Sequence, residues 1–112
     1  MIKLAFLVKR IEGMSREEFI EYHRNTHAPL FASIPEAKLV RKYVISHPIA
    51  APGFPEPEYD TLTEIYFDTW ADYESYFGSE NYKTKVHLDE YNFMVQGNYL
   101  VFPSEERIII NN

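Results

Sequence analysis

The chain has 112 residues, no cysteine and a net charge of −6, with 17 acidic against 11 basic residues. This length fits one domain over residues 1–112, because it supplies one core and is too short for two. The basic residues are scattered, which argues against nucleic acid as a partner, since phosphate binding needs a concentrated basic face. The lack of cysteine excludes disulfides and thiol catalysis and fits a reducing cytoplasm.

Aromatic residues are abundant, with nine Tyr, eight Phe and one Trp. This is more flat apolar surface than a small core needs, and a subunit interface or an aromatic pocket would use the excess. The apolar run within residues 1–10 is only five residues long between lysines, so it fits a strand better than a signal peptide. No segment approaches the roughly 20 apolar residues of a membrane span, so we expect no membrane partner.

The chain begins with a strand and a capped helix. Residues 2–9 are apolar on both faces, which predicts a central strand. Ser15 can cap a helix that runs to about Phe31, and Glu18 can reach back to the cap, as in a capping box.

The predicted helix contains an interruption. Pro29 cannot donate to the carbonyl of Asn25, and its ring disfavours the α conformation at the preceding residue. We therefore expect a kink or a restart between residues 25 and 29. Local repair of the released carbonyls by polar side chains and a functional role both remain open. These side chains are His23, Asn25, Thr26 and His27.

The middle of the chain predicts two strands joined by a long loop. Residues 39–47 are β-branched and aromatic, and residues 61–68 form the next strand. Between them, residues 48–60 hold four prolines and predict a stiff loop, which is a candidate lid over a site.

The last third predicts an interrupted helix and a final strand. Thr69 caps the helix, Gly78 breaks it and Ser79 caps a second segment. Residues 98–102 and 106–110 predict the last strand, with Pro103 restricted to an edge or a bulge.

The order strand, helix, strand, strand, helix, strand is the ferredoxin-like α+β plan, in which helices cover one face of a four-stranded antiparallel sheet. The other face also carries apolar side chains, and in so short a chain only a second copy can cover it. We therefore expect a homodimer in which two sheets pack face to face. Its aromatic interior could hold a small hydrophobic or aromatic ligand.

The sequence resembles the EthD family over nearly its whole length. The resemblance is carried by Ser15-x-x-Glu18-Phe19-x-x-Tyr22, His27-Ala28-Pro29-Leu30, Pro35, Tyr43, the strand from Glu64 to Phe67, and Glu105-Glu106. It implies a dimeric α+β barrel, shared with small cofactor-free monooxygenases and muconolactone isomerases. Family members act in degradation of ethyl tert-butyl ether or in polyketide tailoring. His27 matches the family's histidine in its H-A-P-L motif and is carried over as the site residue.

The chemistry expected at His27 is general acid–base catalysis without a cofactor. Histidine as a residue type titrates near neutral pH and suits proton movement next to a carbonyl or a phenol. An isomerase, a dehydratase or an oxygenase acting on a cyclic or aromatic metabolite could use it. The alternative is a non-catalytic dimer that binds such a ligand or serves as an accessory protein of a degradation pathway.

Six further polar residues are candidates for substrate binding. They are Tyr22, His23, Tyr43, His47, Glu64 and Tyr66. Tyr22 could orient a substrate oxygen or pack in the core with its hydroxyl at the rim. Tyr43 and His47 share one face of their strand and join the pocket only if that face points inward.

Glu64 lies in the middle of an aromatic strand, on the same face as Tyr66. It either pairs across the sheet with Lys42, Arg41 or Lys3, or performs acid–base work.

His23 and His27 have the i, i+4 spacing that places two imidazoles on one helical face, as in a zinc site. Arg24 stands where zinc hydrolases place a glutamate base, and a third ligand would have to come from His47 or His87 through folding. We therefore expect no metal and no other cofactor, and His87 as a partly exposed helical residue.

Overall fold

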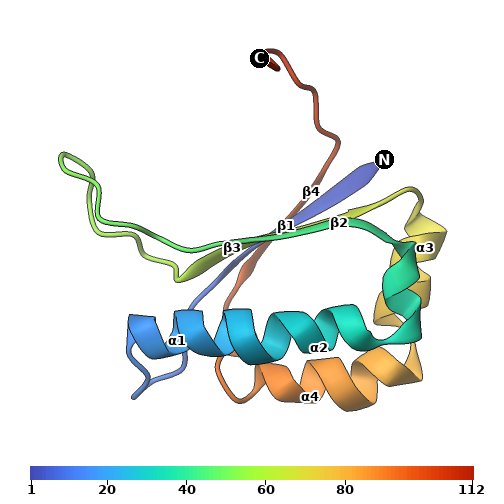
Figure 1. The fold of residues 1–112 in the computed structure, drawn as a ribbon, viewed down its shortest axis with the longest axis horizontal. Coiled ribbons are helices and arrows are strands. Elements are labelled where there is room, and N and C mark those ends of the chain that lie inside the picture. The colour runs from blue at the N-terminus through green and yellow to red at the C-terminus, as the bar shows by residue number, and fades with distance from the viewer.

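The computed structural model describes residues 1–112 and contains one antiparallel sheet with the strand order β2-β3-β1-β4. The strands are β1 (Ile2–Val8), β2 (Val40–Ser46), β3 (Thr61–Phe67) and β4 (Leu100–Ser104). All helices lie on one side of this sheet, and the other side carries none (Figure 1). The predicted ferredoxin-like plan is confirmed. β1 is central as predicted, and β4 is an edge strand, where Pro103 is tolerated.

The helical segments follow the predicted order. They are α1 (Arg16–Tyr22), the π-helical turn η1 (His23–His27), α2 (Ala28–Ser33), the 3-10 turn η2 (Pro35–Leu39), α3 (Trp70–Phe77), the π-helical turn η3 (Tyr82–Val86) and α4 (His87–Glu90). The predicted capping box is present, since the Glu18 amide donates to Ser15 Oγ at 3.1 Å and Glu18 accepts from the Ser15 amide at 2.9 Å. None of these helices is long and apolar enough to cross a bilayer.

Of the kink or restart predicted before Pro29, the structure shows the restart, because α1 ends at Tyr22 and α2 begins at Ala28 after the π turn. Ala28 is helical, with φ −62° and ψ −44°, and its amide donates to the carbonyl of His23, five residues earlier. The chain therefore passes from α1 to α2 through a π turn without leaving the helical conformation. Pro29 falls in the first turn of α2, where its missing N–H is tolerated.

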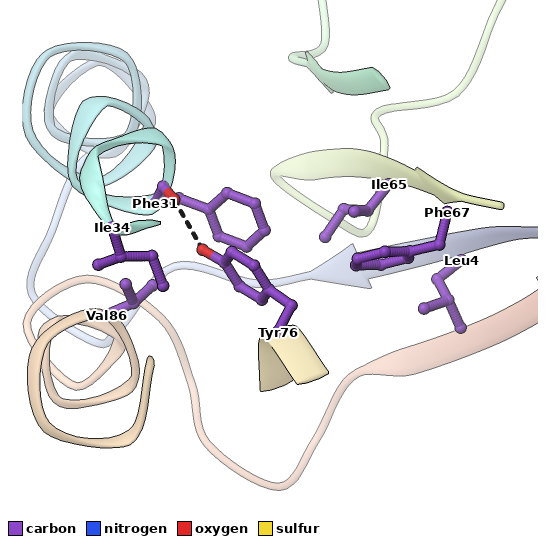
Figure 2. Close-up of a cluster of buried hydrophobic side chains, with 7 residues drawn as sticks. All are labelled: Leu4, Phe31, Ile34, Ile65, Phe67, Tyr76 and Val86. Carbon is purple, nitrogen blue, oxygen red and sulfur yellow. Dashed lines mark hydrogen bonds between the residues drawn. The ribbon is translucent and has the colours of Figure 1, made fainter. Parts of the chain in front are cut away.

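The core lies between the sheet and the helices (Figure 2). It consists of Leu4, Phe31, Ile34, Ile65, Phe67, Tyr76 and Val86. The Tyr76 hydroxyl donates to the carbonyl of Phe31 at 2.7 Å, which ties α3 to α2. The Phe31 ring stacks on both Tyr43, at 4.3 Å between centroids, and Tyr76, at 4.5 Å. Tyr43 therefore points toward the helices, which settles the orientation of β2.

The last strand is shorter than predicted. It ends at Ser104, which pairs with Lys3 near the beginning of β1, so the residues that follow have no neighbouring strand to bond. Residues 106–110 are not a strand, and the chain leads away from the sheet on the side opposite the helices (Figure 1).

Candidate functional site

A pocket opens between the sheet and the helices. It holds about 560 Å³ of empty space, including the part of its mouth that is open to solvent. Its apolar walls are Phe6, Val8, Phe31, Ile65, Phe77 and Met94. Its polar lining residues are His23, His27, Tyr43, Thr63, Tyr82, Glu90 and Tyr99. Three of the residues proposed from the sequence, His23, His27 and Tyr43, therefore meet in one place.

His27 forms a dyad with Asp89 of α4. Its Nδ1 lies 2.9 Å from Asp89 Oδ2, and the other carboxylate oxygen accepts a hydrogen bond from the Tyr22 hydroxyl. Burial acts to raise the pKa of Asp89, but hydrogen bonds from Tyr22, His27 and Asn92 outweigh it and hold that pKa below its usual value. Asp89 is thus an ionised acceptor, and it holds the proton of His27 on Nδ1.

The second nitrogen of His27 is free to act in the pocket. Nε2 has no hydrogen-bond partner in the protein, and no buried side-chain nitrogen or oxygen lacks a partner. Nε2 is therefore accessible, and His27 lines the pocket. In the neutral ring with its proton on Nδ1, Nε2 carries a lone pair that can take a proton from a ligand.

A buried aromatic ring holds the dyad in place. Phe93 is fully buried and lies 4.7 Å from the His27 ring, 5.1 Å from Tyr22 and 5.4 Å from His23, measured between centroids. The Tyr22 ring packs on Phe93, and its hydroxyl donates to Asp89. Packing on three sides restricts the rotamers of these side chains.

His23 pairs with His47 and not with His27. The His23 Nδ1 and the His47 Nε2 are 3.0 Å apart. Burial, followed by the proximity of His47 and His27, lowers the pKa of His23 to about 3. Burial also lowers the pKa of His47, with a further contribution from Arg24. Both rings are neutral at pH 7, so one donates its N–H to the other.

The polar side chains of the π turn do not repair backbone carbonyls. His23 bonds to His47 and His27 bonds to Asp89. Neither histidine side chain therefore bonds a backbone carbonyl released at the interruption of the helix. No group of three or more histidine, aspartate or glutamate side chains is placed to hold a metal ion.

Glu64 and Tyr66 lie on the face of the sheet opposite the pocket, so neither lines the pocket with His27. Glu64 pairs with Lys3 at 2.7 Å, which confirms one of the cross-sheet partners considered for it. The Tyr66 hydroxyl donates to Glu106 at 2.6 Å. Both are sequence neighbours of Ile65, whose side chain points to the helices. Successive side chains of a strand point to opposite faces, so those of Glu64 and Tyr66 point away from the helices.

The proline-rich loop does not cover the pocket. None of residues 48–60 lines it, and the loop projects beyond the end of the sheet (Figure 1). Arg16, at the start of α1, donates to the carbonyl of Pro57 at 3.2 Å. The expected lid is therefore wrong for this conformation.

Sequence reasoning missed Asp89, Glu90 and Tyr82. The segment from His87 to Glu90 has the composition of a solvated helix end, and no spacing indicated which of its acids faces inward. Asp89 is found only by folding, because its contact with His27 joins residues 62 positions apart.

Comparison with known proteins supports this fold over its whole length. A crystal structure of an ethyl tert-butyl ether D (EthD) family protein from Bacillus halodurans superposes with a TM-score of 0.73 and 24% identity, covering 96% of this chain and 99% of that one. An EthD-like protein from Ralstonia eutropha gives a TM-score of 0.69 and 15% identity, covering 99% and 94%. A dimeric ferredoxin-like protein of unknown function from Bacteroides fragilis gives 0.67 and 15%, covering 94% and 95%.

At the level of sequence, no curated protein matches the chain. The EthD domain model, in contrast, matches residues 11–97, a range that includes the His27–Asp89 dyad and most of the pocket lining. Because this match covers well over half of the chain, the protein belongs to the EthD domain family.

Proposed function

We propose that this protein is a cofactor-independent enzyme that moves a proton on a hydrophobic cyclic or aromatic metabolite, with His27 as the acid–base residue. The reaction would be of the isomerase, dehydratase or oxygenase type, in a degradative or tailoring pathway. The observation that carries the proposal is the accessible His27 Nε2 in an aromatic pocket, with Nδ1 fixed on ionised Asp89.

The dyad supports proton transfer for a physical reason. When Nε2 takes a proton, the ring becomes a cation next to the Asp89 carboxylate, which stabilises that cation. His23 stays neutral beside it, so it adds no opposing charge. Asp89 and Tyr22 are positioning residues in this proposal, while His23 and Tyr43 contact the ligand from the pocket wall.

We also propose that the protein is a homodimer formed through the free face of its sheet. This face exposes Leu100 and Phe102, whose side chains are 55% and 69% accessible. Similar proteins from Bacteroides fragilis and Thermobifida fusca are described as dimeric. Two such faces in contact would remove these apolar side chains from water.

The test is base-catalysed exchange of carbon-bound hydrogen on a cyclic aryl ketone. Tetralone is incubated with the protein in heavy water, and loss of the proton signal next to its carbonyl is followed by NMR. We expect the protein to accelerate this exchange, His27→Ala to return it to the buffer rate, and Asp89→Asn to slow it by about tenfold or more.

The matched control is Asn25→Ala, which changes an exposed residue of the same π turn. It should exchange tetralone at the parent rate. Saturation-transfer NMR on the same samples reports binding separately. Binding of tetralone without exchange by the parent protein would overturn the enzyme proposal and favour the alternative, a non-catalytic ligand-binding or accessory protein.

A further inference from the structure

The pocket lining contains an acidic residue and no basic one. None of its lining residues is a lysine or an arginine. One of them, Glu90, is an acid, and His23 is neutral because of its lowered pKa. Moving an anion from water into this pocket therefore costs free energy that no fixed cation offsets.

Glu90 presents hydrogen-bond acceptors on the wall of the pocket. Its Oε2 accepts from the Tyr82 hydroxyl at 2.7 Å, and its Oε1 lies 3.1 Å from Nδ1 of His87. Each carboxylate oxygen has two lone pairs, so each keeps one acceptor position after these contacts. Tyr82 and His87 fix the Glu90 carboxylate and leave some of its hydrogen-bond acceptor positions free.

Tyr43 supplies a free donor on the wall of the same pocket. Its hydroxyl has no partner in the protein, although its ring is held by the stack on Phe31. Tyr43 and Glu90 line the same pocket. Burial raises the pKa of Tyr43, and the charge of Glu90 raises it further. Tyr43 therefore stays protonated at neutral pH and can donate to a ligand.

We propose that the pocket selects an uncharged ring compound that carries a hydroxyl group, of the phenol or enol class, and that Glu90 accepts the hydrogen bond from this hydroxyl. Tyr43 donates to the same oxygen, and the ring lies between the aromatic walls. The carboxylic acid of the same ring is rejected, because its charge would face Glu90. This selectivity deepens the proposed function but needs only the pocket, not turnover at His27.

The experiment compares β-naphthol with β-naphthoate, which share one ring system and differ in charge at neutral pH. Calorimetric titration of the parent protein should show that β-naphthol binds at least about tenfold more tightly, the size expected for a hydrogen bond to a charged group. Glu90→Gln should lower the affinity for β-naphthol by about tenfold and raise the affinity for β-naphthoate. The preference for β-naphthol should therefore narrow or reverse.

Glu80→Gln is the matched control, because it removes the same charge at an exposed position before η3. It should keep the parent selectivity. Equal affinity of the parent for both probes, no binding of β-naphthol, or unchanged selectivity in folded Glu90→Gln would each overturn the proposal. Selectivity is measured by calorimetric binding of the two naphthalene compounds to the parent protein, whereas proton transfer is measured by NMR exchange of tetralone. Failure of one proposal is therefore distinguishable from failure of the other.

Discussion

His23 is the residue whose environment changes its chemistry most. Only 2% of its surface is exposed, and it packs against both Phe19 and Phe93 with one nitrogen on His47. Neutral imidazole can be accommodated there, but a protonated ring would be a buried cation beside two other histidines. His27 has an accepting carboxylate that His23 lacks. Two histidines four positions apart therefore have different roles.

The lowered pKa of His23 predicts an acid-sensitive fold. The unfolded chain takes up a proton at this residue near pH 6.5, whereas the folded chain does so only near 3. His23 therefore contributes full stability above pH 6.5 and loses it as the pH falls toward 3, by up to about 1.4 kcal/mol per pH unit. We expect His23→Gln to show a shallower loss of unfolding free energy between these limits, measured by urea titration.

The substitution of the more exposed His87, His87→Gln, is the matched control for this series and should keep the parent slope. Equal slopes for His23→Gln and the parent would show that His23 is not the group responsible. Glutamine can still bond to His47, so the comparison changes titration more than packing.

At the scale of elements, each of the two helical regions that meet at the site contains a π turn, η1 and η3. The turn His23–His27 carries both pocket histidines, and the turn Tyr82–Val86 leads directly into the helix that supplies Asp89 and Glu90. Such turns occur often at functional sites, because the extra residue re-aims side chains without ending the helix. The dyad depends on how these two segments meet.

A buried carboxylate holds three segments of the chain together. Asp60 is 3% exposed and accepts hydrogen bonds from the Arg10 amide at 2.9 Å, from the Arg10 guanidinium and from Arg16 Nε at 2.9 Å. It thereby links the end of the proline-rich loop to the segment after β1 and to α1. Burial acts to raise its pKa, but these hydrogen bonds outweigh it and lower that pKa overall.

We expect Asp60→Asn to lower the free energy of unfolding by about 2 kcal/mol, because two arginines lose their charge partner at a buried position. Urea titration followed by circular dichroism measures this. Asp68→Asn is the matched control, since Asp68 pairs with Arg41 where both side chains are about half exposed. It should cost well under about 1 kcal/mol. A loss at Asp60 no larger than that at Asp68 would contradict the role assigned to Asp60.

At the scale of the whole molecule, the two faces of the sheet differ. One face packs against the helices and forms the core and the pocket, while the other has no covering element in the chain (Figure 1). The residues after β4 add Ile108, Ile109 and Ile110, which are 68%, 88% and 75% exposed. Apolar side chains concentrated on one side favour association over a monomer.

The proposed homodimer predicts a change of mass on a single substitution. Phe102→Asp should convert a dimer into a monomer, because it places a carboxylate in the proposed apolar contact while leaving the core untouched. Light scattering measures the mass. Ile49→Asp changes another exposed apolar residue, in the proline-rich loop, and should leave the dimer intact. A parent protein that is a stable monomer would contradict the proposed dimer.

Local patterns in the sequence determined much of this protein. The capping box at Ser15, the alternation of Glu64 with Ile65 and the order of the elements depend on residues close together in the chain, so they could be predicted together with the fold. The interruption before Pro29 was also predicted, but its form was not, because a π turn satisfies the backbone in a way that local rules do not anticipate.

Only the tertiary structure decided what surrounds His27. Asp89, Glu90 and Tyr82 come from the far end of the chain, and their positions depend on how η3 and α4 pack against η1 and α2. The same packing turned Tyr43 inward, put His47 on His23, and left Glu64 and Tyr66 on the outer face. Charge and proton affinity at a site depend on burial and neighbours. These exist only once distant segments meet, so the sequence by itself determined the fold but not the chemistry around His27.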